Sequence, residues 1–224
     1  MSRTMIKLCG LQVEEDVKVI QELDVDAAGF ILVPQRKRTV TPERIRRLQV
    51  LLPPSVRTIA VMMDPTAEEV ESLLQTVRVD GIQLHGEESP AFCRRLKAMG
   101  VNVIKVFHMK AESDEISDTE TYAPWIDHAL LDSVVAGVHG GSGKRFAWER
   151  IPAIRQQWHS LGVPLWVAGG INPENVTELL GYGLDGVDVS SGIETAGRKN
   201  PVLMKRLVER VRQVEQCGIA GKSR

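Results

Sequence analysis

The sequence predicts an α/β fold, a single closed (β/α)8 or TIM barrel that spans residues 1–224. Eight short apolar runs alternate with amphipathic stretches, and no linker or low-complexity segment divides the chain. Eight repeating units favour a closed barrel near the small end of its size range, because doubly wound sheets usually have five or six strands. Asp80–Leu84 also resembles Asp185–Val189, as two halves of four units each would produce.

The apolar runs are unbroken rather than alternating, which is typical of parallel strands that are covered on both faces. We expect the eight strands at Met5–Cys9, Ala27–Val33, Thr58–Met63, Gly81–His85, Val103–Phe107, His128–Asp132, Pro164–Ala168 and Asp185–Ser190. The stretch Met109–Trp125 has no clean helical pattern. We therefore expect a loop with a short or irregular helix between the fifth and sixth strands.

Start signals precede most of the expected helices. A capping side chain stands directly before a proline at the first helical position in Thr41-Pro42, Ser89-Pro90, Asn172-Pro173 and Asn200-Pro201. Thr66 and Glu69 have the spacing of a capping box, in which each side chain accepts from the backbone of the other residue. These signals predict helices that return the chain from one strand to the next.

Composition and charge narrow the class of protein. Lys plus Arg is 28 and Asp plus Glu is 29, so the net charge of −1 gives no sign of attraction to nucleic acid or to a membrane surface. The three cysteines are odd in number and form no C-x-x-C pair, which fits a reducing compartment. No apolar run has the length of a signal peptide or a membrane span. We expect a cytoplasmic protein that is a monomer or a homodimer.

Functional residues of such a barrel lie where the strands end. Cys9 ends the first strand, and it is either a small buried apolar side chain or a thiolate base or nucleophile. Asp132 ends the sixth strand, and it is either a loop-ordering acceptor or a general acid whose pKa is raised by partial burial. His85 either contacts substrate or caps its strand, and Asp64 ends the third strand.

Glycine-bearing loops follow the seventh and eighth strands, at Gly169-Gly170 and at Ser190-Ser191-Gly192. Exposed backbone N–H groups at such places favour an anion, and these two loops are the usual phosphate site of the barrel. A single loop of this kind would be read as a turn, but two adjacent ones predict a phosphate site. A third stretch, Gly140–Arg145, is a candidate lid with further anion contacts.

The charged and metal-binding side chains give weaker signals. The five histidines show no H-x-H or H-E-x-x-H spacing and no neighbouring carboxylate cluster, so the sequence predicts no metal site. The run Arg36-Lys37-Arg38 lies in the loop after the second strand. It is either solvated charge or the source of one arginine that binds a substrate carboxylate.

Taken in order, these residues resemble the phosphoribosylanthranilate isomerase family of tryptophan biosynthesis. The motifs that carry the resemblance are Lys7–Gly10, Gly29–Ile31, Arg38–Val40, Gln83–Gly86, Leu130–Ser133, Gly140–Gly143, Phe146 with Trp148, Ala168–Ile171, Asn175-Val176 and Gly186–Glu194. Each motif is weak alone, but the ordered set covers nearly the whole chain and is specific.

The resemblance implies an Amadori rearrangement of N-(5-phosphoribosyl)anthranilate to 1-(2-carboxyphenylamino)-1-deoxyribulose 5-phosphate. It implies that Cys9 is the general base, that Asp132 is the general acid and that Arg38 binds the anthranilate carboxylate. The phosphate would be held by Gly169, Gly170, Ser191 and Gly192, and we expect His85 and Asp188 to contact the substrate. No cofactor is implied, because the protonated imine of the substrate is itself the electron sink.

The chain departs from the family pattern at a few places. Gln12 replaces a common hydroxyl residue, Arg36-Lys37 replaces a small residue and a proline, and Ala147 replaces an aspartate. Two other readings therefore stay open. One is a phosphate-sugar-binding barrel with lost or altered activity, against which the presence of both Cys9 and Asp132 argues. The other is the related isomerase of an aminoimidazole-carboxamide ribotide, which is expected to use two aspartates.

Overall fold

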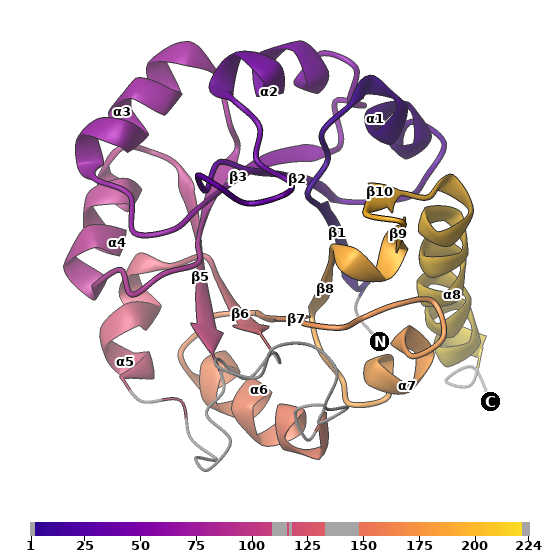
Figure 1. Ribbon diagram of the computed structural model, residues 1–224. Coiled ribbons are helices and arrows are strands. Elements are labelled where there is room, and N and C mark those ends of the chain that lie inside the picture. The colour runs from indigo at the N-terminus through magenta and orange to yellow at the C-terminus, as the bar shows by residue number, and fades with distance from the viewer. Residues whose placement is uncertain (1–2, 109–115, 117, 133–147, 221–224) are drawn as a thin grey trace.

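The computed structural model describes residues 3–108, 116, 118–132 and 148–220. Eight parallel strands form a closed barrel in which each strand pairs with the next and β8 pairs with β1. Figure 1 looks down the barrel, with the strands as an inner ring and the helices around them. The predicted (β/α)8 barrel is confirmed.

The barrel strands lie close to the expected places. They are β1 (Met5–Cys9), β2 (Ala27–Ile31), β3 (Arg57–Met62), β4 (Gly81–Leu84), β5 (Asn102–His108), β6 (His128–Asp132), β7 (Leu165–Ala168) and β8 (Gly186–Val189). Several predicted strands were one or two residues too long. β3 begins one residue earlier than expected, at Arg57, and β5 extends one residue past both expected ends, from Asn102 to His108.

The helices are α1 (Glu14–Ile20), α2 (Pro42–Gln49), α3 (Ala67–Thr76), α4 (Pro90–Ala98), α5 (Thr119–Tyr122), α6 (Ile151–Ser160), α7 (Val176–Leu180) and α8 (Pro201–Ala220). Short 3-10 turns lie at η1 (Ala123–Trp125), η2 (Trp148–Arg150) and η3 (Ser191–Ile193), and a small antiparallel pair joins β9 (Glu194–Thr195) to β10 (Arg198–Lys199). The short α5 agrees with the expectation for this unit, whose residues 109–115 and 117 lie outside the described part.

The predicted caps are present at most helix starts. The side chains of Thr41, Thr66 and Ser89 each accept a hydrogen bond from the backbone N–H of the third residue of the following helix. The Asn200 side chain accepts from Val202 and Leu203 at the start of α8. The Asn172 side chain instead orders a turn, and α7 itself begins only at Val176.

Two layers of apolar packing hold the barrel. Inward-facing side chains fill its interior, and they include Ile59, Ile104, Val106, Leu130 and Trp166. A larger cluster fills the space between the strands and the surrounding helices. Because side chains alternate along a strand, the inward positions of β5 continue from Ile104 and Val106 to His108 at its end.

Four aspartates form the same hydrogen bond at the end of the barrel where the strands begin. Each precedes an even-numbered strand and accepts a hydrogen bond from a backbone N–H at the start of the preceding odd-numbered strand. The pairs are Asp26 with Ile6, Asp80 with Thr58, Asp127 with Val103 and Asp185 with Leu165, at 2.7–2.8 Å. The likeness between Asp80–Leu84 and Asp185–Val189 is thus one part of a fourfold repeat of strand pairs.

Candidate active site

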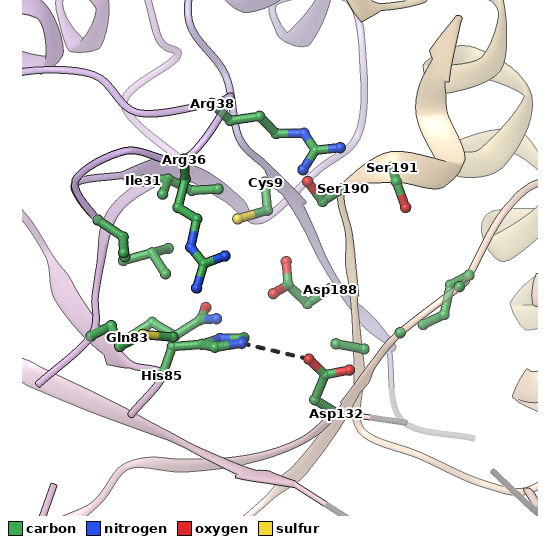
Figure 2. A pocket seen from close by; sticks show the side chains of 17 residues that line it. Cys9, Ile31, Arg36, Arg38, Gln83, His85, Asp132, Asp188, Ser190 and Ser191 are labelled. Atoms are coloured by element: carbon green, nitrogen blue, oxygen red, sulfur yellow. Dashed lines mark ion pairs between the residues drawn. The ribbon is translucent and has the colours of Figure 1, made fainter. Parts of the chain in front are cut away.

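A cavity of about 410 Å³ opens at the carboxyl ends of the strands. Figure 2 shows its lining side chains, which come from most of the strands and from the loops that follow them. Cys9 from β1 and Asp132 from β6 face this one cavity, as do His85 and Asp188. The strand-end residues that the sequence singles out are therefore brought together, with the exception of Asp64.

Cys9 is buried above an ion pair inside the barrel. Lys7, one inward position below it on β1, has its Nζ 2.8 Å from Oδ1 of Asp188 on β8, and both side chains are buried. Burial raises the pKa of the Cys9 thiol, and the positive charges of Lys7 and Lys199 partly oppose that shift. Burial disfavours the charged form of Lys7, but Asp188 and Cys9 outweigh it, so the pKa of Lys7 is raised.

Gly29 has no side chain, which leaves space for the Cys9 thiol and the Lys7 ammonium group. A Cβ atom there would lie 2.8 Å from the Cys9 sulfur and 2.9 Å from Lys7 Nζ. Gly29 is the register partner of Cys9 on β2. Any larger residue would push the thiol or the ammonium out of place.

Asp132 lies at the mouth of the barrel beside two histidines. Oδ2 of Asp132 is 3.6 Å from Nε2 of His85, and the two side chains are 14% and 28% exposed. The His85 ring meets the His108 ring edge-on at a centroid distance of 5.1 Å. Burial lowers the pKa of His85, while the nearby Asp132 carboxylate opposes the shift.

The loop that carries His85 is fixed by a buried carboxylate. Glu88 accepts hydrogen bonds from the backbone N–H groups of Asp64 and Gly86, and its Oε2 lies 2.9 Å from Nζ of Lys105. The Asp64 carboxylate accepts from the backbone N–H of Glu87 in the same loop, at 2.7 Å. Asp64 thus orders the loop and does not line the cavity.

Arg38 is held at the rim of the cavity by Glu194. Its Nε and Nη2 donate to the two carboxylate oxygens of Glu194 at 2.6 and 2.7 Å. Lys199 donates to the same carboxylate at 2.7 Å, and it also donates to the carbonyl of Ser190. One edge of the Arg38 guanidinium is therefore occupied, and its third nitrogen, Nη1, lies on the other side.

Arg36 is a cavity residue that the sequence analysis did not single out above its neighbours. Its side chain points toward the centre of the cavity, between His85 and Asp188, whereas Arg38 points along the rim (Figure 2). This side chain makes no hydrogen bond or ion pair with the described residues, whereas the Arg36 carbonyl accepts from the backbone N–H of Thr39 at 3.1 Å. The loop that presents it is anchored by Gln12, whose amide donates to the carbonyl of Lys37 at 3.1 Å.

The two glycine-bearing loops, which follow β7 and β8, contact each other at one wall of the cavity. Gly169, Gly170 and Ser191 line the cavity. Gly192 does not line it, but a Cβ atom there would lie 1.8 Å from the carbonyl oxygen of Ile171, so only glycine permits the close approach of the two loops. Gly170 has a positive φ of 65°, and its carbonyl accepts from the Asn175 side chain.

Two predictions fall on residues that lie outside the described part of the chain. They are the candidate lid at Gly140–Arg145 and the replacement at Ala147. His108, by contrast, was missed because the fifth strand was expected to end at Phe107. Following the inward alternation of that strand one step further would have placed His108 beside Asp132, its register partner.

The chain is similar to one family over most of its length. A family model described as N-(5'phosphoribosyl)anthranilate (PRA) isomerase matches residues 6–210. A curated protein of Brevibacillus brevis named N-(5'-phosphoribosyl)anthranilate isomerase is 37% identical over 215 residues, which cover 95% of this chain and 96% of the relative.

Solved structures agree with that similarity. The phosphoribosyl anthranilate isomerase of Thermotoga maritima superposes with a TM-score of 0.81 at 33% identity, covering 94% of this chain and 99% of that chain. A second solved isomerase is a complex with reduced 1-(o-carboxyphenylamino)-1-deoxyribulose 5-phosphate. It superposes with a TM-score of 0.76 at 30% identity, with coverage of 94% and 99%.

Proposed function

The chain belongs to the N-(5'-phosphoribosyl)anthranilate isomerase family, and we propose that Cys9 and Asp132 are the base and the acid of its reaction. The protein is an isomerase of tryptophan biosynthesis. The observation that supports the two roles is that a thiol from β1 and a carboxylate from β6 face one cavity. A substrate held between them is open to an acid on one side and a base on the other.

The reaction needs two proton transfers at neighbouring atoms. Asp132 donates a proton to the ribose ring oxygen, the bond from that oxygen to C1′ breaks, and the nitrogen lone pair forms a C1′=N double bond. The Cys9 thiolate then removes the proton from C2′. The electron pair forms a C1′=C2′ bond while the nitrogen recovers its lone pair, which gives an enolamine. Protonation at C1′ and loss of the enol proton yield the ketose.

The surroundings of Cys9 act on its role as base in two directions, because burial raises the pKa of the thiol overall. The Lys7 and Lys199 ammonium groups favour the thiolate against the effect of burial. Proton transfer by such a positioned group typically contributes about 10²- to 10⁴-fold to the rate.

We propose that Arg38 binds the anthranilate carboxylate through the guanidinium edge that Glu194 leaves available. Glu194 is then a positioning residue, because it fixes the plane of the guanidinium by two hydrogen bonds. Arg36 supplies a second positive charge inside the same cavity. His85 and Asp188, which also line it, are placed to contact the ribose part of the substrate.

The phosphate is assigned, as part of the same proposal, to Gly169, Gly170, Ser191 and Gly192. The support is that these loops follow β7 and β8 and meet at one wall of the cavity. Backbone N–H groups there need no lysine or arginine to bind an anion. The chemistry requires no cofactor, since the substrate nitrogen accepts the electrons.

The proposal also covers the location, domain content and partners of the protein. No helix in the described part of the chain is both long and apolar enough to cross a membrane. We propose a cytoplasmic protein of one folding domain, residues 1–224, that is a monomer or a homodimer and whose partner is its phosphorylated substrate. It has no nucleic-acid partner in this proposal.

The test is turnover of N-(5-phosphoribosyl)anthranilate, followed by the loss of its fluorescence, with the reaction repeated in D₂O. We expect one deuterium at C1′ of the product, because the proposed C1′ proton comes from exchangeable groups. Product without deuterium would show that the C2′ hydrogen itself is carried to C1′, and would contradict protonation of C1′ by exchangeable groups. The aminoimidazole-carboxamide ribotide serves as the second substrate, and turnover of that compound alone would favour the related isomerase.

A further inference from the structure

Three side chains with metal-binding atoms converge at one side of the cavity mouth. His85, His108 and Asp132 each offer one ligand atom, and these atoms all lie within 4.8 Å of one another. His85 Nε2 and Asp132 Oδ2 lie 3.6 Å apart. Two imidazoles and one carboxylate therefore surround a common point that lies next to the cavity.

The barrel itself fixes this arrangement. His85 directly follows β4, and His108 and Asp132 are the last residues of the neighbouring strands β5 and β6. His108 and Asp132 are register partners, so their side chains leave the sheet at the same level and in the same direction. Neighbouring strands lie about 4.8 Å apart, which keeps the three side chains close without any long loop.

The spacing suits a transition metal after small side-chain rotations. Bonds of about 2.0–2.1 Å from Zn²⁺ to imidazole nitrogen or carboxylate oxygen require ligand atoms roughly 3.3 Å apart. The His85–Asp132 pair is already near that value. His108 Nε2 donates to the carbonyl oxygen of His85 at 3.3 Å, so its ring faces β4 and gives up this hydrogen bond if Nε2 binds the ion.

The donor set also selects the class of ion. Imidazole nitrogen suits Zn²⁺, Co²⁺, Ni²⁺ and Cu²⁺, whereas Mg²⁺ and Ca²⁺ prefer oxygen ligands only. His85 Nδ1 is buried and has no hydrogen-bond partner among the described residues, so Nε2, which faces Asp132, is the nitrogen that would bind the ion. His85 and Asp132 also line the adjoining cavity.

We propose that His85, His108 and Asp132 form a binding site for Zn²⁺ and related transition-metal ions, and that an ion bound there inhibits the enzyme. The inhibition rests on the proposed function of Asp132. A carboxylate oxygen that coordinates the ion cannot carry the proton needed for ring opening, and the ion also narrows the entrance used by the substrate. The reaction itself uses no metal in this scheme.

Binding is tested first, without any assay of activity. The full-length protein is titrated with Co²⁺, whose visible absorption reports nitrogen and oxygen ligands, and Zn²⁺ is then added as the competitor. We expect one Co²⁺ per chain, displaced by Zn²⁺. His108→Ala should weaken binding by about tenfold or more, since loss even of a group that only supports a ligand costs 10- to 100-fold.

The matched control is His159→Ala, which removes an exposed histidine that pairs with Asp185 outside the cavity. This variant should bind Co²⁺ like the wild type. Unchanged affinity in His108→Ala, or equal losses in both variants, would overturn the site.

Inhibition is tested second, as the ratio of rates with and without Zn²⁺ in each protein, with EDTA added to reverse the effect and Mg²⁺ as the comparison ion. The wild type and His159→Ala should lose activity with Zn²⁺, while His108→Ala should require at least about ten times more. Co²⁺ binding at the site with no inhibition by Zn²⁺ would overturn the inhibitory role. A protein that turns over no substrate would contradict the proposed function, and the Co²⁺ titration would still decide the metal site.

Discussion

The Cys9 thiol is surrounded by groups that act on its charge in opposite directions. Burial and the carboxylate of Asp188 disfavour the thiolate, whereas Lys7 and Lys199 favour it. The sequence identifies Cys9 from its place at the end of a strand, but it does not reveal Lys199, which is far away in the chain and reaches the site through β10. The electrostatic surroundings of a buried residue depend on such long-range contacts.

We predict that the Cys9 thiol titrates above its ordinary pKa, because burial is the largest influence on it. The measurement is the ultraviolet absorbance of thiolate as the pH rises, taken as the difference between the wild type and Cys9→Ser. Lys7→Gln should move this titration to still higher pH, since it removes the nearest positive charge. A lower midpoint in Lys7→Gln would mean that Lys7 does not stabilise the thiolate.

The arginines of the β2–α2 loop should differ in their effect on substrate binding. Arg38→Ala should raise KM about 10- to 100-fold, because a hydrogen bond to a charged group contributes roughly 1.5–3 kcal/mol. Arg36→Ala should raise it less, and Lys37→Ala, whose exposed side chain does not line the cavity, should have little effect. A larger loss in Arg36→Ala than in Arg38→Ala would assign the carboxylate to Arg36.

At the scale of the elements, loops rather than strands decide the shape of the site. The β4–α4 loop is held by Glu88, the β2–α2 loop by Gln12, and the loops after β7 and β8 by their close contact at Gly192. The sequence shows which loops contain glycine and charge. It does not show that Glu194 occupies one edge of Arg38, because the pairing of two loops is a property of the folded barrel.

Gly170 provides a test of the phosphate assignment at the loop after β7. Gly170→Val should raise KM for the phosphorylated substrate, since a branched side chain crowds the backbone N–H groups beside it. Gly183→Val is the matched control, because Gly183 also has a positive φ and open space around it but does not line the cavity. Both variants should lose about 1–3 kcal/mol of stability from backbone strain.

The comparison of the two variants separates strain from binding. Steady-state kinetics gives KM, and thermal unfolding gives the loss of stability. An equal KM in the two folded variants would place the phosphate elsewhere in the protein.

At the scale of the whole molecule, the barrel is a ring of four strand pairs, each closed by one aspartate. The number and order of the strands were predictable from the sequence, because eight apolar runs with capped helices between them leave few alternatives. The sequence shows only two of the four aspartates as a repeat. Asp80 and Asp185 are each followed by glycine, whereas Asp26 and Asp127 are not. Their common role appears only in the hydrogen bonds.

We predict that Asp80→Ala lowers the free energy of unfolding by about 1–3 kcal/mol, because it leaves the backbone N–H of Thr58 without its partner. Asp80→Asn should cost less, since the amide oxygen still accepts a hydrogen bond. Urea denaturation measures both, and a single domain should unfold in one transition. Two separate transitions would contradict a single cooperative barrel, and equal stability of wild type and Asp80→Ala would contradict the role of the repeat.

The central claim is that Cys9 and Asp132 are the base and the acid of one isomerisation. The most direct measurement is kcat for Cys9→Ser and Asp132→Asn in the fluorescence assay, with Cys217→Ser as the control at an exposed cysteine. We predict a fall of about 10²- to 10⁴-fold in each of the first two variants, with binding of the phosphorylated product retained, and no change in the control. Turnover at the wild-type rate in Cys9→Ser or in Asp132→Asn would contradict the account.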